Sequence, residues 1–298
     1  MELLVFSFMS FFLLASTLST SNFEGKQRSF YRQLRFTGEH EYAVVTYDAL
    51  EGLYGIAATM NVWQPTVERG TISREYSSAQ IRIRAGTDDD FNVIEAGWHV
   101  YPWYYSMQGE NGEPYKARLF ISWTNNSYAS ACYNLDCGGF VMENNGVELG
   151  SPFEPTSLYD GGQVDIVLAI WKDAQLRRWK LMYNNIIVGH WPEELFTHLR
   201  TRGTEGEWGG EVFNTKHNNR FTSTQMGSGH DAAEGYGKAG YFKQLLVETS
   251  GTGHQWISPQ SLRGEVSDHN YYTIRSEDDI DGLGNGGFYY GGPGNTNP

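Results

Sequence analysis

The sequence predicts an all-β fold, an antiparallel β-sandwich with a concave groove and one short helix. Glycine is abundant at 35 of 298 residues, and aromatic residues make up 15% of the chain. Such a composition is typical of proteins built from strands and turns. Many short runs have strand character, whereas a single segment has the pattern of an amphipathic helix. These observations favour two packed sheets, curved to form a groove.

The N-terminal end has the pattern of a secretory signal peptide. Residues 3–18 are apolar, a run too short for a membrane span of about 20 residues. Small residues follow, as cleavage requires, although Glu2 stands where a positive charge is usual. A signal anchor is therefore the alternative. We predict a signal peptide over residues 1–21, a short linker or pro-segment remnant over 22–38 and a secreted domain over 39–298.

Strand patterns fill the first half of that domain. Residues 42–47 are β-branched and aromatic. Residues 79–84 alternate between inward isoleucine and outward arginine, so Gln80 shares the outward face. Residues 117–123 and 139–142 read as strands around the cysteines.

The second half adds a central strand, a hairpin and the helix. Residues 164–171 are apolar on both faces, which is typical of a central strand. Residues 178–183 and 186–191 flank an Asn-Asn pair and predict a hairpin. Residues 192–200 begin with proline and have an apolar stripe, so they predict the one helix. Residues 239–247 form a further strand.

The two cysteines and one sequon fit an oxidising compartment. Cys132 and Cys137 are separated by four residues, and in a secreted chain they predict a local disulfide. Asn125 heads the sequon Asn-Asn-Ser and is the candidate glycosylation site. Two cysteines are too few ligands for a zinc site, so we expect no metal.

The net charge of −13 argues against nucleic acid as a partner, because phosphate binding needs a basic surface. An acidic surface is also what many soluble proteins have. No other segment is apolar enough to span a bilayer. We expect a monomer that is free of the membrane after signal cleavage.

Two similar stretches, residues 93–98 and 207–212, each place a glutamate beside glycine and tryptophan in a strand. Alternate side chains of a strand share a face. Glu95 and Glu211 therefore project from faces that carry glycines, and glycine in a strand often marks close approach of a ligand or backbone. We expect the two glutamates to meet across a cleft as an acid–base pair. The alternative for each is a solvated edge or a salt bridge.

A crowded carboxyl pair divides into one protonated and one ionised group at mildly acid pH. Such a pair can hydrolyse a peptide bond with an activated water. It can equally hydrolyse a glycosidic bond, and the many aromatic residues would suit a sugar-binding cleft. The residues alone leave both reactions open, as well as a carbohydrate-binding module.

Several motifs in order make the chain resemble the neprosin family of plant secreted glutamic peptidases, which cleave after proline. The resemblance extends from about residue 39 to the C-terminus. The motifs are Asn61–Pro65, Ser78–Ile81, Ile94–Trp98, Cys132–Asn134 with Cys137, Gly139–Val141, Gly189–Pro192, Trp208–Val212, Gln225–Gly229 and Tyr289–Gly294.

The resemblance implies an antiparallel β-sandwich whose concave face holds two catalytic glutamates, matched here by Glu95 and Glu211. It further implies hydrolysis of proline-rich peptides or proteins at acid pH, without metal or cofactor. Gln80 and Gln225 are candidates for positioning the water or the oxyanion, with a structural amide as the alternative. The pro-segment expected of the family is very short here, and two expected cysteines are absent. A catalytically silent member is therefore a further alternative.

Overall fold

The computed structural model describes residues 39–68, 74–107, 115–129, 131–216, 221–252, 255–282 and 286–296. These residues belong to a unit that spans Gly38–Pro298. The predicted signal peptide (1–21) and linker (22–38) lie outside the described residues, so both stay predictions. Within the described ranges, no helix is long and apolar enough to cross a membrane.

One sheet of the fold has seven antiparallel strands and carries both Glu/Gly/Trp stretches. Its order is β14-β1-β11-β3-β4-β5-β6, so β11 comes late in the chain but lies between β1 and β3. The strand bounds are β1 Glu39–Leu53, β3 Tyr76–Gly86, β4 Phe91–Val100, β5 Arg118–Thr124, β6 Cys132–Tyr133, β11 Gly203–Asn214 and β14 Arg263–Val266.

The second sheet has nine strands in the order β15-β16-β12-β2-β8-β9-β10-β7, with β13 paired to β12. The predicted central strand is confirmed as β8, between β2 and β9. The bounds are β2 Gly55–Asn61, β7 Val141–Met142, β8 Asp165–Asp173, β9 Arg178–Tyr183, β10 Ile186–Pro192, β12 Gly240–Glu248, β13 Trp256–Ile257, β15 Thr273–Glu277 and β16 Gly287–Gly291.

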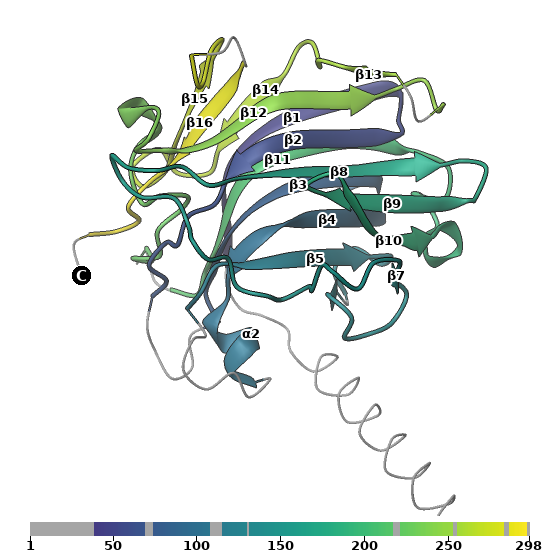
Figure 1. Ribbon diagram of the computed structural model, residues 1–298, viewed down its shortest axis with the longest axis horizontal. Helices are drawn as coiled ribbons and strands as arrows, with labels where there is room; N and C mark the ends of the chain where they lie inside the picture. The colour runs from purple at the N-terminus through teal and green to yellow at the C-terminus, as the bar shows by residue number, and fades with distance from the viewer. Residues whose placement is uncertain are drawn as a thin grey trace, which may run out of the picture. The chain divides into compact units, whose positions relative to one another are not determined.

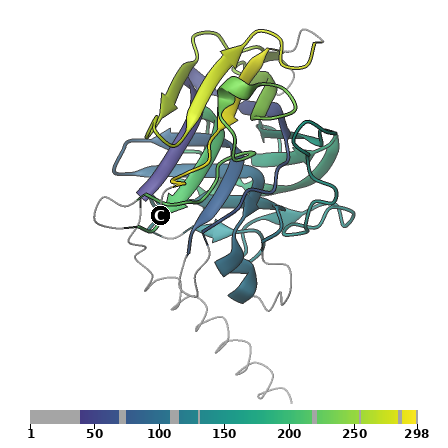
Figure 2. The same cartoon turned by 90° about the vertical axis from the view of Figure 1, so that its left-hand side faces the viewer.

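The two sheets lie face to face as a sandwich, which confirms the predicted fold class (Figure 1, Figure 2). Trp98 of β4 and Trp208 of β11 are both 0% exposed in the core between them. Their indole Nε1 groups donate across the layers to the carbonyl oxygens of Asn61 (3.0 Å) and Ala57 (3.1 Å) of β2. The tryptophans therefore point inward, and the glutamates of the same strands point away from the second sheet.

The predicted hairpin is confirmed. Strands β9 and β10 pair antiparallel on either side of Asn184 and Asn185, which have φ values of 46° and 66°. Asparagine tolerates this left-handed conformation better than most residues, and type I′ hairpin turns require it at both positions.

The predicted helix over residues 192–200 is wrong. Only Glu193–Leu195 is helical there, as a short 3-10 turn, η1, and the next residue is extended. The Asn92 Oδ1 atom accepts hydrogen bonds from the backbone N–H groups of His198 (2.6 Å) and Leu199 (3.1 Å). Lys172 Nζ donates to the carbonyl oxygen of Arg200 at 2.6 Å. Tertiary partners thus satisfy the backbone groups that a helix would have paired internally.

The described α-helix, α2, spans Pro102–Met107 directly after β4. Figure 1 shows it at one end of the strands. Proline at its first position fits, because that N–H would have no helical partner. A further 3-10 turn, η2, spans Ala232–Glu234.

Candidate active site

The candidate residues lie on the outward face of the seven-stranded sheet, in rows that run across β4, β3 and β11. Gln80 on β3 is paired with Gly97 of β4 on one side and with Gly209 of β11 on the other. Glu95 and Glu211 project from the same face of the two flanking strands. The glutamates therefore sit on one sheet face, with β3 between them, close enough for the charge of one to act on the other. Their action as an acid–base pair across a cleft stays a prediction.

The two glycines are needed for close packing of backbones. A Cβ atom on Gly97 would lie 2.0 Å from the carbonyl oxygen of Ala79 on β3. A Cβ atom on Gly209 would lie 2.4 Å from the carbonyl oxygen of Ala43 on β1, and its φ of +156° is rare for other residues. Close approach of a neighbouring strand, rather than of a ligand, explains these glycines.

Glu211 is held by three donors. Gln80 Nε2 donates to its Oε2 atom at 2.8 Å, and His40 Nδ1 lies 2.5 Å from its Oε1 atom. The Tyr76 hydroxyl also donates to Oε1. Burial opposes ionisation of Glu211, but protonated His40 and the bonds from His40 and Tyr76 outweigh it and lower the pKa to about 2.

Glu95 has a different environment. The Tyr128 hydroxyl donates to its Oε1 atom, and the Arg82 guanidinium lies farther off, with Nη1 at 3.8 Å. Burial raises the pKa of Glu95 above its ordinary value, and the negative charge of Glu211 adds to this, while Arg82 and the Tyr128 bond only partly oppose it. The two carboxyls therefore depart from the ordinary glutamate pKa in opposite directions.

This separation divides the chemistry between the two groups. Between about pH 2 and the ordinary glutamate pKa of 4.5, Glu95 holds a proton and can donate it, while Glu211 is ionised and can accept one. Because the two groups interact, a titration would report values for the pair rather than for each residue alone. The arrangement can thus supply a general acid and a general base at once.

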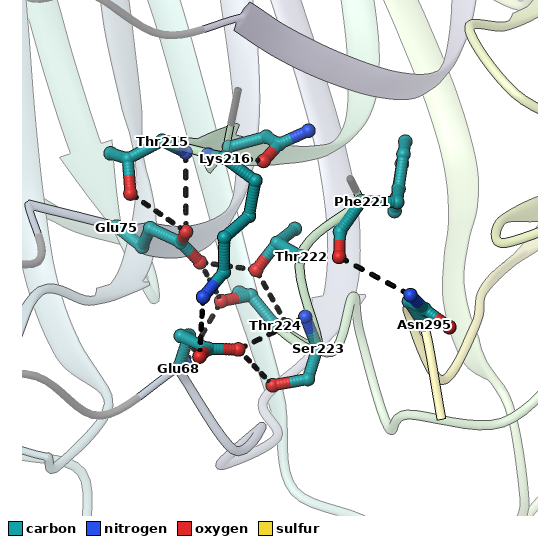
Figure 3. Close-up of polar contacts among 10 residues, drawn as sticks. Glu68, Glu75, Thr215, Lys216, Phe221, Thr222, Ser223, Thr224 and Asn295 are labelled. Atoms are coloured by element: carbon teal, nitrogen blue, oxygen red, sulfur yellow. Dashed lines mark hydrogen bonds and ion pairs between the residues drawn. The ribbon is translucent and has the colours of Figure 1, made fainter. Parts of the chain in front are cut away.

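The start of β3, next to Tyr76, is anchored by a buried carboxylate (Figure 3). Glu75 accepts hydrogen bonds from Thr215 N (3.1 Å), Thr215 Oγ1 (2.9 Å) and Thr224 Oγ1 (2.5 Å), and from the Thr222 hydroxyl. Glu68 nearby is bonded to Lys216 and Ser223. The end of β11 and segment 221–224 are thus tied to the residue that precedes Tyr76.

A family model described as Neprosin matches residues 73–293. The match covers most of the chain. The chain belongs to the neprosin family. Both glutamates, Gln80 and the strands β3, β4 and β11 that carry them fall within the matched residues, so the resemblance to the family is confirmed.

Among solved structures, scytalido-glutamic peptidase with a transition-state analogue inhibitor is similar, with 13% identity and a TM-score of 0.44 over 86% of this chain and 100% of that one. The CBM40 domain of the Ruminococcus gnavus IT-sialidase bound to α2,6-sialyllactose has 11% identity and a TM-score of 0.29 (61% and 92%). The leech intramolecular trans-sialidase has 10% identity and a TM-score of 0.27 (80% and 41%). Because the identities and TM-scores are this low, the function of this neprosin-family chain has to be argued from its own residues.

Gln225 is not brought to this group. Its Oε1 atom accepts a hydrogen bond from the backbone N–H of Thr66 at 2.8 Å, and the backbone N–H of Gln225 donates to the carbonyl oxygen of Thr66. The next residue, Met226, packs against Gly210 from the core side of β11. These contacts give Gln225 a structural role, whereas Gln80 contacts Glu211 directly.

Two further predicted sites lie beside β5. Cys132 and Cys137 form the predicted disulfide. Asn125 is exposed, and its Nδ2 atom donates to the carbonyl oxygen of Leu195 at 3.1 Å. Glycosylation at Asn125 stays a prediction. The described part of the chain contains no group of three or more His, Cys, Asp or Glu side chains that could hold a metal ion.

Five residues of the site were not singled out by the sequence. Strand alternation could have indicated three of them, because Tyr76 and Arg82 share the face of Gln80 on β3, and Glu207 shares the face of Glu211 on β11. The other two reach the glutamates from the start of β1 and from the turn after β5. The five are His40, Tyr76, Arg82, Tyr128 and Glu207.

Proposed function

We propose that the chain is an acid-acting glutamic endopeptidase in which Glu211 is the general base and Glu95 the general acid. The single observation that carries the proposal is the opposite direction of their two pKa shifts on one sheet face. An ordinary carboxyl loses much of its charge below pH 4, but Glu211 stays ionised there. Glu95 keeps its proton over the same range.

In the proposed reaction Glu211 takes a proton from a water molecule as its oxygen bonds to the scissile carbonyl carbon. Glu95 donates a hydrogen bond to the carbonyl oxygen, which becomes an oxyanion. When the C–N bond breaks, the proton of Glu95 passes to the leaving nitrogen. The proton on Glu211 then returns to solvent or to Glu95, which restores the starting state.

The surrounding donors support this division of roles. Burial raises the pKa of the Tyr76 and Tyr128 phenols well above the ordinary value, so both remain hydrogen-bond donors throughout the working range. Gln80 lies between the two flanking strands and donates to the base. It is thus placed to orient a water molecule near Glu211.

The substrate proposal is a proline-containing peptide or protein. Next to the base, the ring of Tyr76 packs on Tyr101 (5.1 Å between centroids) and on Phe213 (5.8 Å). Tyr101 and Phe213 are both 4% exposed, so they hold the Tyr76 ring in place, and the substrate proposal rests on membership of the neprosin family. Secretion, action as a monomer without cofactor or nucleic acid, and freedom from the membrane belong to the same proposal.

The test is cleavage of a quenched fluorescent peptide with an internal proline, by secreted protein, between pH 2 and pH 8. Glu95→Gln and Glu211→Gln are each expected to lower kcat/KM at least a hundredfold. Glu205→Gln is the matched control, because Glu205 shares the strand and face of Glu211 but lies farther along β11.

The outcomes separate the proposal from its alternatives. Cleavage that survives either Gln substitution would refute the mechanism. Wild-type protein that cleaves no peptide would support the silent family member, and retention on cell-wall glycans with no peptide cleavage would support the carbohydrate-binding module.

A further inference from the structure

A row of three ionisable residues, one of which is the acid Glu95, crosses the site. Glu207 on β11 is opposite Arg82 on β3, and Arg82 is opposite Glu95 on β4. All three side chains are largely buried, with exposed fractions of 10%, 14% and 9%. The guanidinium therefore lies between two carboxyl groups that both compete for it.

The contacts of Arg82 are unequal. Its Nη2 atom lies 2.8 Å from Glu207 Oε2, a hydrogen-bond distance, whereas its Nη1 atom lies 3.8 Å from Glu95 Oε1. Its Nε atom is buried and has no partner among the described residues. The guanidinium is thus within hydrogen-bond distance of Glu207 and beyond that distance from Glu95.

We infer that Glu207 is a positioning residue, which acts through Arg82 to keep the acid Glu95 free of a close ion pair. This inference rests on the proposed role of Glu95 as the proton donor. A guanidinium in direct contact would stabilise the ionised form of Glu95 and remove the proton that the reaction uses. At 3.8 Å the positive charge stays near Glu95 but stabilises its ionised form less than a direct ion pair would.

Glu207 can hold Arg82 without cancelling its charge. Burial raises the pKa of Glu207 to about 7, although Arg82 opposes this. In acid solution Glu207 is then a neutral carboxyl whose oxygen accepts the Arg82 hydrogen bond. The positive charge stays available to the carboxylate of Glu211 and to a developing oxyanion.

Other titratable groups face this row from each neighbouring element. Their charges act on Glu95 in the wild type and in the Glu207 variants described below. At low pH few of these groups are ionised, because the tyrosines stay neutral. The groups are His40 and Tyr42 of β1, Glu205 and Glu211 of β11, Tyr128 after β5 and Tyr133 of β6.

The test follows the titration of Glu95 directly, by NMR of protein labelled with 13C at the glutamate carboxyls. Its resonance is assigned by its loss in Glu95→Gln. In Glu207→Ala the midpoint is expected to fall by roughly 1 pH unit or more, because Arg82 can close on Glu95. In Glu207→Gln, whose amide oxygen still accepts the bond, it should stay near the wild-type value.

A double substitution isolates the path through Arg82. In an Arg82→Gln background, Glu207→Ala should leave the Glu95 midpoint unchanged. If wild-type protein cleaves peptides, the alkaline limb of kcat/KM should move to lower pH with the midpoint in Glu207→Ala alone. Glu207→Ser serves the same purpose if the alanine variant does not fold.

An unchanged midpoint in Glu207→Ala would overturn the inference, as would an equal fall in Glu207→Gln or a fall that persists without Arg82. Because the NMR measurement needs no substrate, it remains decisive if the protein proves to have no peptidase activity. That second result would refute the proposed function and leave the positioning of Arg82 established or rejected by itself.

Discussion

His40 offers the sharpest test of the electrostatics around the base. Its Nδ1 atom lies 2.5 Å from Glu211, and the charge of His40 is the largest of the effects that lower the pKa of that carboxyl from 4.5 to about 2. His40→Gln keeps a hydrogen-bond donor but removes the positive charge. An opposite charge at this range lowers a carboxyl pKa by about 1–3 units, so we expect that of Glu211 to rise by roughly 1–2 units in the variant.

The consequence for activity depends strongly on pH. If only ionised Glu211 works as the base, its ionised fraction at pH 3 falls about twofold to tenfold in His40→Gln, and hardly at all at pH 6. The acid limb of kcat/KM should therefore move to higher pH, and the alkaline limb should move the same way by less, because the charge of His40 is only a minor influence on the pKa of Glu95. His230→Gln is the control, because His230 is also half-exposed and lies 3.0 Å from a glutamate outside the site.

Stability gives a second measurement with a defined sign. Folding raises the pKa of His40 and lowers that of Glu211. The histidine's contribution is present below about pH 6.5 and is lost as pH rises through its folded pKa. The glutamate's contribution is present above about pH 4.5 and is lost as pH falls toward 2. Urea unfolding should thus show His40→Gln to be less stable than wild type near pH 5.5 and equal to it at pH 9. An acid limb and a pH 5.5 stability that both match wild type would refute the reasoning.

Two further predictions concern the scaffold. Trp98 and Trp191 are both 0% exposed, but only the first has an indole N–H partner among the described residues, the carbonyl oxygen of Asn61. Urea unfolding should show that Trp98→Phe costs about 1–3 kcal/mol more than Trp191→Phe, and equal costs would contradict the proposed cross-layer bond. Gly97→Ala should lower Tm and activity together because its Cβ would meet the backbone of β3, whereas Gly264→Ala, whose Cβ would have 3.9 Å of space, should leave both near wild type. A Gly97→Ala protein with wild-type Tm would show that the strands can separate at no cost.

Alternation alone predicted which way the key side chains point. Trp98 and Trp208 face the core between the sheets, and Glu95, Glu211 and Gln80 face the other side of their sheet, because alternate side chains of a strand share a face. Alternation predicts which face of the sheet a side chain lies on, but it does not predict which strands pair with one another. That β11 pairs with β3 follows from tertiary packing of distant segments, so the position of Gln80 between two glycines was beyond prediction.

Contacts that depend on loops and strand ends also escaped the sequence. His40 at the start of β1 and Tyr128 in the turn after β5 reach the glutamates through space, with no repeat to indicate them. The prediction of a helix over residues 192–200 was wrong because contacts with distant residues determine the structure there as well. Asn92 and Lys172, far away in the chain, bind the backbone groups whose helical pattern the local sequence had predicted.

The rows that cross β4, β3 and β11 have a consequence for how such a protein can vary. The distance between its acid and its base is fixed by backbone hydrogen bonds, which pair β4 with β3 and β3 with β11. Insertion or deletion of a single residue within β3 would turn Gln80 and Arg82 toward the core and shift both carboxyls relative to their partners. Changes of length can therefore accumulate in the turns, whereas the three strands can change only by substitution, one side chain at a time.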